Sequence, residues 1–454
     1  MRCLRRVACL ALSLAPIAAL AFPGCHAEDN AAKDNAADAA PEASPSPTRD
    51  ATVTANDASD AGPFEAGDAL DPPTFCSNSP CVTQIAAGFV HACALLSDRT
   101  LRCWGSNIYG QLGIGDTSDG GFDRVPRTRP VAVVGLGPVR QIGAGFYDTC
   151  ALQMDGDVYC WGSDRQGMLG NTSPRAFGVP TKVSGLVGTV AELKVGGTHA
   201  CVRMTSGSLQ CWGENTEGQC GVGVRDGGAV EPSTTLPASS QPSGVAMFAT
   251  GATFTCTAGA GGSAPRCFGG NKLGELGRDR DASDLPVDPA PAPLVGLAAI
   301  DAFGLSHGDH GCAIVGGGNV ACWGDNQSGQ TGIPDAASPQ PVPAPVPGLS
   351  DVAEVVTSGR VTCARTRGGD VLCWGNNAHA AAGQSEALPV VYAPMRVPGV
   401  ANATQIALGW DELACALIRG GFVVCWGRNT AGVLGRGGDA GTPEFDMTPR
   451  PVEF

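Results

Sequence analysis

Residues 93–105 read CALLSDRTLRCWG, in which two cysteines stand ten residues apart and the second is followed directly by Trp-Gly. Similar stretches recur as CALQMDGDVYCWG, CVRMTSGSLQCWG, CAIVGGGNVACWG, CARTRGGDVLCWG and CALIRGGFVVCWG, and a degraded copy reads CTAGAGGSAPRCFGG. The seven copies follow one another at intervals of 51–57 residues. A fixed period of this length indicates a repeat array rather than one large hydrophobic core.

Each repeat contains about four strand-like runs, which in the second copy are VRQIGAG, DTCALQM, DVYCWG and PTKVSGL. Glycine is abundant, at 65 residues, and no window has a sustained apolar period of 3.6, so we expect an all-β protein. Four short antiparallel strands repeated seven times predict a seven-bladed β-propeller over residues 76–454. The chain ends in TPRPVEF, which mirrors RTRPVAVVG of the first copy. We expect this last strand to dock against the N-terminal strands near residues 82–96 and close the ring.

The turn after the hairpin carries a second signature. SNIYGQLG, ENTEGQCG, DNQSGQTG and RNTAGVLG follow four of the CWG copies, and a proline and an apolar strand come next. Over residues 82–454 this pattern resembles the repeat of the regulator of chromosome condensation (RCC) family. The resemblance implies a seven-bladed propeller and a function in binding protein partners. The paired cysteines resemble those of exported bacterial members rather than those of eukaryotic nuclear ones.

The cysteine spacing fits a β-hairpin with a three-residue loop. In the second copy the loop is 154–156, and its last residue, Gly156, favours the left-handed conformation that such a loop requires. Cys150 then faces Cys160 at a non-hydrogen-bonded position, where Cα atoms are about 4.5 Å apart. This distance allows a disulfide. Buried thiols are an alternative, and zinc fits less well because each pair supplies only two ligands.

In an exported chain such pairs are expected to be oxidised. The predicted disulfides are Cys93–Cys103, Cys150–Cys160, Cys201–Cys211, Cys256–Cys267, Cys312–Cys322, Cys363–Cys373, Cys415–Cys425 and Cys76–Cys81. The two cysteines of the fourth repeat are eleven residues apart, so a bulge must absorb one residue for that bridge to form. Cys220 replaces the leucine of GQLG and is expected to be a buried thiol.

The N-terminus reads MRCLRRVACLALSLAPIAALAFPGC, a basic start followed by an apolar run and a cysteine. It predicts an export signal over residues 1–24. FPGC resembles a bacterial lipobox, so we expect lipidation at Cys25 and a membrane-anchored lipoprotein. Phe22 and Pro23 depart from the usual lipobox, and ordinary secretion or an uncleaved anchor are the alternatives.

Residues 25–75 predict a disordered linker, because they are rich in alanine, proline and serine and offer little apolar surface to bury. Residues 26–75 hold eleven acidic and two basic residues, a net charge of −9. With +3 from the signal, the remainder of the chain carries −8 of the total of −14. A mildly acidic domain without clustered Lys and Arg argues against nucleic acid as a partner.

Six of the repeats place a tryptophan after the second cysteine, on the opposite face of the strand. These residues are Trp104, Trp161, Trp212, Trp323, Trp374 and Trp426. We expect them to pack between neighbouring blades. The alternative is an exposed platform that stacks on carbohydrate or peptide. Phe268 replaces tryptophan in the fourth repeat, a change that a packing role tolerates.

The stretch SHGDHG places His307, Asp309 and His310 together, and resembles part of a metallohydrolase HxHxDH motif without its leading histidine. His310 stands at the repeat position of His91 and His199, so we favour a structural or tunnel-lining role. The aspartates of GRDRDASD are either a weak calcium site or a solvated loop. The sequence shows no nucleophile turn, phosphate loop or cofactor motif, so neither an enzyme nor a cofactor is expected.

Three unequal connections after the third strand are the expected recognition sites, at 116–129, 225–244 and 278–293. Growth of a loop without function is the alternative for each of them. The first connection carries the candidate partner-binding residues Phe122, Arg124, Arg127 and Arg129. Together the features predict a monomeric, non-catalytic scaffold of the bacterial cell envelope that binds a protein and meets the membrane only through its lipid. A polysaccharide-binding propeller and a metal-dependent hydrolase are the alternatives.

Overall fold

The computed structural model describes residues 80–115, 121, 123–171, 178–222, 233–240, 243–278, 286–334, 338–410, 412–438 and 444–454. Every described residue belongs to one compact unit, Glu65–Phe454. The predicted signal peptide, Cys25, the linker, Cys76 and Phe122 lie outside the described residues. Among the residues that are described, no helix is long and apolar enough to span a membrane.

Within these ranges, the strands form seven antiparallel sheets, each built from four consecutive strands. The strands of blades 1 to 4 are β1 (Val82–Ala87), β2 (His91–Leu96), β3 (Leu101–Gly105) and β4 (Arg127–Ala132); β5 (Val139–Ala144), β6 (Asp148–Gln153), β7 (Val158–Gly162) and β8 (Thr181–Lys182); β9 (Val190–Val195), β10 (His199–Met204), β11 (Leu209–Glu214) and β12 (Ser233–Ser240); and β13 (Met247–Thr250), β14 (Phe254–Ala258), β15 (Arg266–Gly270) and β16 (Val287–Pro293). The strands of blades 5 to 7 are β17 (Ala302–Gly304), β18 (His310–Val315), β19 (Asn319–Gly324) and β20 (Gln340–Pro345); β21 (Val352–Ser358), β22 (Val361–Thr366), β23 (Val371–Asn376) and β24 (Val390–Arg396); and β25 (Ala403–Leu408), β26 (Leu413–Ile418), β27 (Phe422–Arg428) and β28 (Phe445–Pro451). The short 3-10 helices η1 (Arg165–Gly167), η2 (Ala260–Gly262) and η4 (Thr430–Gly432) lie between strands.

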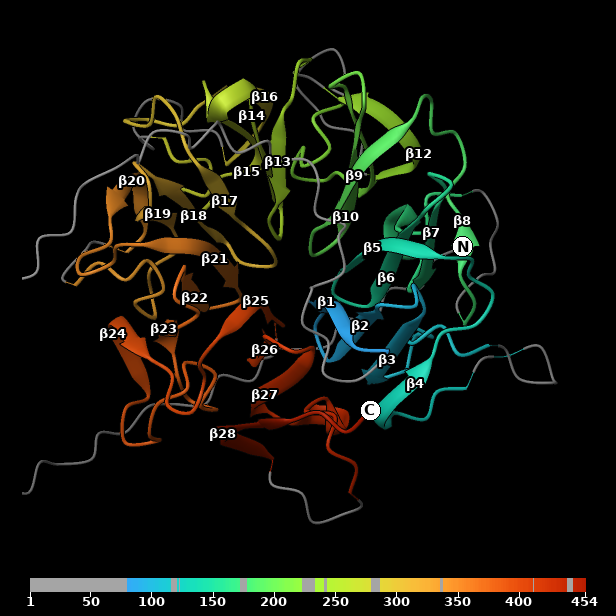
Figure 1. Ribbon diagram of the computed structural model, residues 1–454. Helices are drawn as coiled ribbons and strands as arrows, with labels where there is room; N and C mark the ends of the chain where they lie inside the picture. Colours follow the sequence, from blue (N-terminus) through green and yellow to red (C-terminus); the bar gives the residue numbers. More distant parts are fainter. Residues whose placement is uncertain are drawn as a thin grey trace, which may run out of the picture. The chain divides into compact units, whose positions relative to one another are not determined.

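The seven sheets are the blades of a propeller, as the repeat predicts (Figure 1). The first strand of each blade contacts the first strand of the next, from β1 through β5 and β9 round to β25, and β25 contacts β1. The first strands therefore line the axis. The fourth strands lie at the outside, which explains why β28, for example, has no fully buried residue.

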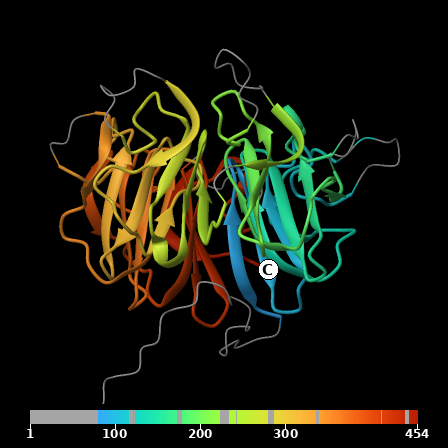
Figure 2. The same ribbon diagram turned by 90° about the horizontal axis from the view of Figure 1, so that it is seen from above.

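Because neighbouring strands are antiparallel, the connections alternate between two rims (Figure 2). One rim, here called the loop rim, carries the connections from first to second strands and the long connections from third to fourth strands. The opposite rim, here called the hairpin rim, carries the tight turns between second and third strands. The long connections therefore share one rim with the loops nearest the axis.

The prediction for ring closure was wrong. The last strand, β28, pairs with β27 of its own blade and not with the N-terminal strands. Blade 7 instead meets blade 1 through whole-blade packing, in which the Gln405 side chain accepts from the Ile85 N–H at 2.8 Å and donates to the Ile85 carbonyl at 3.0 Å. Each repeat already contains its own fourth strand, so no blade needs a strand from the other end of the chain. Past β28, the Phe454 ring contacts Trp104, with centroids 5.9 Å apart.

Seven hairpin disulfides join the second and third strands of the blades. They link the predicted pairs, and the Cα atoms are 4.1 Å apart in every bridge, as expected for a non-hydrogen-bonded position. In blade 4 the additional residue is accommodated in η2, so Cys256 still faces Cys267. Cys81 is disulfide-bonded, and its predicted partner Cys76 lies outside the described residues. Cys220 is a fully buried thiol.

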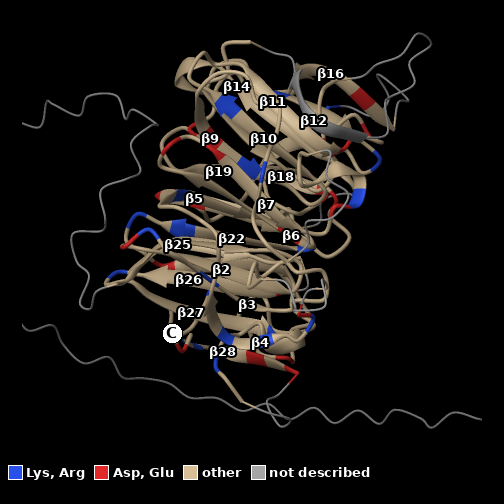
Figure 3. Cartoon of the chain, turned by 90° about the vertical axis from the view of Figure 1, so that its right-hand side faces the viewer, with Lys and Arg blue, Asp and Glu red and all other residues tan. Residues whose placement is uncertain are grey.

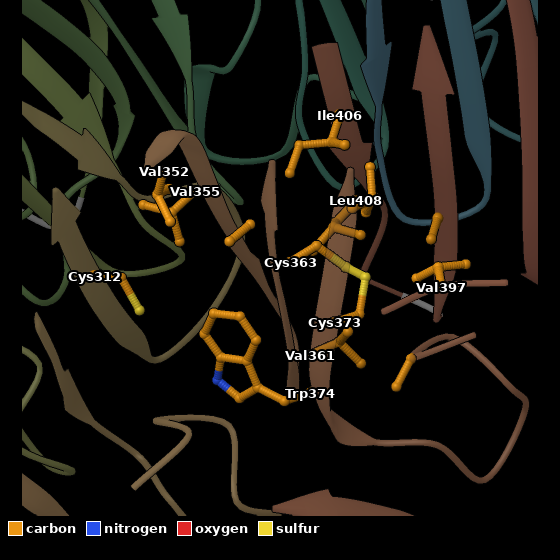
Figure 4. Close-up of a cluster of buried hydrophobic side chains, with 14 of the residues drawn as sticks. Cys312, Val352, Val355, Val361, Cys363, Cys373, Trp374, Val397, Ile406 and Leu408 are labelled. Atoms are coloured by element: carbon orange, nitrogen blue, oxygen red, sulfur yellow. A yellow bond between two sulfur atoms is a disulfide. The ribbon is translucent and has the colours of Figure 1, made fainter. Parts of the chain in front are cut away.

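The six tryptophans of the CWG stretches are fully buried between blades. Each donates its indole N–H to a backbone carbonyl in the preceding blade, as Trp374 does to Gln330 at 2.9 Å. Figure 4 shows Trp374 beside the Cys363–Cys373 bridge in a cluster of apolar side chains. A Cβ on Gly332, which has a φ of +69°, would lie 2.6 Å from the Trp374 indole nitrogen. These rings are packing elements, so the expectation of blade packing holds and a stacking platform made of them is excluded.

Candidate binding rim

The predicted recognition connections start on the loop rim, but the structure places strands over part of each. Arg127 begins β4, 233–240 form β12, and 287–293 form β16. These fourth strands resemble loops in sequence because they lie at exposed edges, where proline is tolerated and few apolar residues are needed. The remaining central parts, 116–120, 223–232 and 279–285, lie outside the described residues.

Two of the three candidate arginines are held by nearby carboxylates. The Arg127 guanidinium contacts the Asp123 carboxylate four residues earlier. Arg129, within β4, pairs with Glu453 at 2.6 Å and so joins blade 1 to the C-terminal residues of the chain. Arg124 is exposed. Arg127 and Arg129 therefore support the base of the connection.

A continuous series of aromatic rings crosses the loop rim from its centre to the junction of blades 1 and 2. From the centre outward it consists of Trp410, Phe146, Phe89, Tyr147 and Tyr109. Successive centroids are 5.0, 6.1, 5.3 and 5.0 Å apart. All five side chains are only partly buried. We call this series the aromatic path.

The inner end of the path is fixed by backbone hydrogen bonds between the loops of different blades. The Trp410 N–H donates to Gly88 at 3.2 Å, the Phe89 N–H to Phe146 at 3.1 Å, and the Phe146 N–H to Gly197 at 3.0 Å. A Cβ on Gly197 would lie 2.6 Å from the Phe146 ring, so a larger residue there would displace the ring. The loops of neighbouring blades thus hold the rings in a rigid arrangement at the mouth of the ring axis.

His307 lies beneath the aromatic path and connects opposite sides of the propeller. Its loop belongs to blade 5, yet its Nε2 lies 2.7 Å from the Ala144 carbonyl of blade 2. Its Nδ1 lies 2.9 Å from the Ser306 hydroxyl, and its ring centroid is 5.8 Å from that of Phe146. Burial lowers the pKa of His307 to about 4, so the ring is neutral near pH 7. His307 therefore fills the mouth of the axis.

The three histidines at the repeat position two residues before the first cysteine bridge adjacent blades. His91, His199 and His310 are fully buried, and the Nε2 of each lies 2.7–3.0 Å from a threonine hydroxyl in the next blade. Within the described residues, no group of three or more His, Cys, Asp or Glu is placed to hold a metal ion. The sequence neighbours His307 and His310 thus serve two separate contacts, which supports the structural interpretation of SHGDHG.

Four carboxyl groups from blades 3, 4 and 5 lie on the same rim: Glu217, Glu275, Asp309 and Asp325. Burial, with the Asp325 charge next in size, raises the pKa of Asp309 to about 6. Burial likewise raises the pKa of Glu275 to about 7. Lys272 contacts Glu217 at 2.5 Å. Elsewhere on the blades, basic and acidic residues are interspersed (Figure 3).

The aromatic path is the feature that sequence reasoning missed. Its central rings each follow a glycine at the same repeat position, in GF at 88–89, GF at 145–146 and GW at 409–410. These repeats form blades 1, 2 and 7, which are neighbours only because the ring closes. The Gly-aromatic pairs were thus a usable signal, once the repeats had been aligned and arranged in a circle.

Comparison with known proteins gives the same architecture. Models of the regulator of chromosome condensation (RCC1) repeat match residues 82–111, 139–167 and 190–219, and also 103–152 and 155–203. The chain is 29% identical over 300 residues to the mitochondrial RCC1 domain-containing protein RUG3 of Arabidopsis thaliana, covering 64% of each chain. It is 27% identical over 364 residues to the ultraviolet-B receptor UVR8 of the same plant, covering 78% of this chain and 79% of the receptor.

Among solved structures, yeast RCC1 (Prp20) bound to Kap60 superposes with a TM-score of 0.63 at 21% identity, covering 76% of this chain and 79% of that one. Human WBSCR16 superposes with a TM-score of 0.61 at 20% identity, covering 74% and 86%. At such identities the likeness concerns the fold alone. The repeat matches, the curated relatives and the seven four-stranded blades agree, and the chain is an RCC1-repeat β-propeller.

Proposed function

We propose that this protein is a non-catalytic binding scaffold of a bacterial cell envelope, exported and anchored through a lipid on Cys25, and that it engages a protein partner through the loop rim. The observation that carries the proposal is the aromatic path. Large rings left partly exposed on a rigid surface are typical of sites that bind proteins. The adjoining connections between third and fourth strands differ in length, which suits recognition of one particular partner.

Two further findings support the proposal. Seven buried disulfides suit an oxidising compartment outside the cytoplasm, in agreement with the basic and apolar N-terminus. A structural relative, yeast RCC1, has been crystallised with the protein Kap60. The alternatives have less support, because the CWG tryptophans are buried and the ring nitrogens of His307 contact Ser306 and Ala144.

Site-specific photocrosslinking in native envelopes tests the rim. A photoreactive phenylalanine analogue replaces Ile108 on the loop rim in one variant of the full chain and Phe422 beside the hairpin rim in another. The two positions are matched in exposure, at 46% and 49%. One crosslinked protein obtained from position 108 and absent at position 422 is the expected result. Crosslinks from position 422 alone would reject the rim, and capture of glycan alone would favour the polysaccharide alternative.

The anchor is tested separately. Cys25→Ser in the full chain is expected to abolish incorporation of radiolabelled palmitate and to move the protein from the membrane fraction to the soluble fraction. Cys220→Ser is the matched control, because it removes a cysteine that lies inside the propeller. Unchanged labelling of the Cys25→Ser variant would contradict the lipoprotein assignment and leave the proposed rim untouched.

A further inference from the structure

The surroundings of the aromatic path differ from one side to the other. Its rings come from blades 7, 1 and 2. On that side Glu412, in the loop of Trp410, is held by His379 and Asn376, and Asp148, next to Tyr147, is buried. The larger group of carboxyl groups, Glu217, Glu275, Asp309 and Asp325, lies on blades 3 to 5. Asp309 links the two regions, because it follows His307 by two residues in the same loop and the His307 ring lies against Phe146. An apolar aromatic surface thus continues into an acidic one at the centre of the rim.

The acidic side carries more negative charge than its own cations balance. Asp309 interacts with Asp325 and Glu217, and on the opposing side with Lys272 and Arg360. Glu275 also interacts with Asp309 and Asp325. Glu217, Asp309 and Asp325 therefore face two basic groups, one of which, Lys272, is already paired with Glu217. Glu275, whose pKa is raised to about 7, adds a partial charge near neutral pH. The Oε2 atom of Glu217 is buried without a hydrogen-bond partner among the described residues. An incoming cation would relieve the repulsion between these carboxylates.

We propose that the aromatic path and its acidic border bind a basic segment of the partner protein, in which Lys or Arg side chains alternate with apolar ones. The inference rests on the proposed function and specifies the chemistry of the partner. Apolar side chains of the segment stack on the path, where aromatic pairs gain from offset or edge-on contact. The cationic groups lie over ring faces and beside Asp309, where both the quadrupole of the rings and the carboxylates attract them.

One ring of the aromatic path already binds a cationic side chain of the protein itself. The Arg165 guanidinium lies over the Tyr109 ring, 6.0 Å from its centroid, at the outer end of the path. At the inner end, the buried His307 ring fills the mouth of the axis against Phe146, while Phe146, Phe89 and Trp410 all retain some exposed surface. A structural role in filling the mouth of the propeller axis therefore explains the presence of the inner rings. It does not account for Tyr147 and Tyr109, which continue the series away from the axis.

Peptide binding to the oxidised full chain provides the test. The probe is a fluorescein-labelled nonapeptide of alternating lysine and phenylalanine, followed by fluorescence anisotropy. Comparison peptides carry glutamate in place of lysine, or alanine in place of phenylalanine. Trp410→Ala and Asp309→Asn each probe one half of the site. Their matched controls are Phe422→Ala and Asp351→Asn, an exposed ring and an exposed carboxylate near the hairpin rim.

The basic aromatic peptide is expected to bind at least tenfold more tightly than either comparison peptide. Trp410→Ala and Asp309→Asn should each weaken it about fivefold or more, and the two controls less than twofold. Asp309→Asn preserves the shape of the side chain. If Trp410→Ala impairs folding, the peptide affinity of the Asp309→Asn variant therefore tests the proposal by itself. Equal binding of the lysine and glutamate peptides, or equal effects of Asp309→Asn and Asp351→Asn, would overturn the inference.

The two proposals can fail separately. A protein crosslinked from position 108 together with no preference for the basic peptide refutes the basic segment and leaves the binding rim in place. Absence of any protein crosslink from position 108, with tight and Asp309-dependent peptide binding, supports the chemistry of the site and contradicts a resident envelope partner.

Discussion

At the scale of single residues, three of the seven joints between blades are built from a histidine and a threonine in consecutive repeats. Thr255 donates its hydroxyl proton to the Gln219 carbonyl at 2.8 Å, so His199 must donate from Nε2 to the threonine oxygen at 2.7 Å. The same pairing joins blades 1 and 2 and blades 5 and 6. At the junction of blades 7 and 1 the equivalent residues are Leu413 and Ala92, both apolar and buried. A buried His–Thr hydrogen bond at one junction is thus replaced by two apolar side chains at another.

Because either pair can fill this position, the effects on stability of replacing the histidine and the threonine of one joint should depend strongly on each other. Thr255→Ala leaves the buried His199 N–H without an acceptor and should lower the free energy of unfolding by about 2 kcal/mol. The double variant His199→Leu with Thr255→Ala copies the natural apolar joint and should cost less than the sum of the two single changes. Urea denaturation of the four proteins measures the coupling, and additive losses would contradict it.

The buried histidines also predict acid sensitivity. Burial lowers the pKa of His91, His199 and His310 to about 3 and that of His307 to about 4. In the unfolded chain these histidines become protonated near pH 6.5, whereas in the folded chain they stay neutral. Their contribution to the free energy of unfolding is therefore fully present above pH 6.5 and is lost as the pH falls toward 4. Each histidine contributes a slope of about 1.4 kcal/mol per pH unit in this window.

Thermal melts between pH 4 and pH 8 check this slope. The double variant at His199 and Thr255 should flatten the acid limb relative to the parent chain. Glu275 acts in the opposite sense, because its pKa is raised to about 7 and its stabilisation is lost as the pH rises through that value. An acid limb unchanged by the double variant would show that His199 does not remain neutral in the folded protein.

At the scale of secondary-structure elements, the hairpin could be derived from sequence down to the facing pair of cysteines. A three-residue loop and the twofold alternation of a strand leave one register, and Cys150 does face Cys160. The fourth strands could not be derived as well. They lie at the outer edge, where proline costs no ladder hydrogen bond and apolar residues gain little, so QPVPAP over 340–345 reads as a loop.

The hairpin disulfides should stabilise the blades individually. Replacing both Cys150 and Cys160 by alanine opens one loop of about 11 residues and is expected to lower the free energy of unfolding by about 3 kcal/mol on the chain-entropy model. Differential scanning fluorimetry and denaturant titration under oxidising conditions measure the loss. Cys220→Ala removes a buried thiol without opening a bridge and should cost about 1 kcal/mol. Equal losses in the two variants would mean that the bridge adds nothing beyond packing.

At the scale of the whole molecule, the propeller and the number of its blades follow from the period of the sequence, whereas the candidate site does not. Phe89 and Trp410 are 321 residues apart in the chain, and only closure of the ring brings their loops together. Sequence reasoning searched for recognition residues within single connections such as 116–129. The aromatic path instead takes one or two residues from each of three blades, so no local stretch reveals it.

The way the ring closes also predicts how stable the joint between blades 7 and 1 is relative to an internal joint. The joint between blades 7 and 1 uses the Gln405 amide on both backbone groups of Ile85, and the joint between blades 2 and 3 uses Gln141 on both backbone groups of Leu193, at 2.9 Å each. The seam between the first and last blades of the propeller is therefore built like an internal joint. Gln405→Ala and Gln141→Ala should each lower the free energy of unfolding by about 2 kcal/mol, because each leaves a backbone donor and acceptor without partners. Urea denaturation of both variants measures the difference, and hydrogen exchange at the Ile85 and Leu193 amides reports each joint directly. A markedly larger loss for Gln141→Ala, with fast exchange at Ile85 already in the parent chain, would show that the ring opens at its seam.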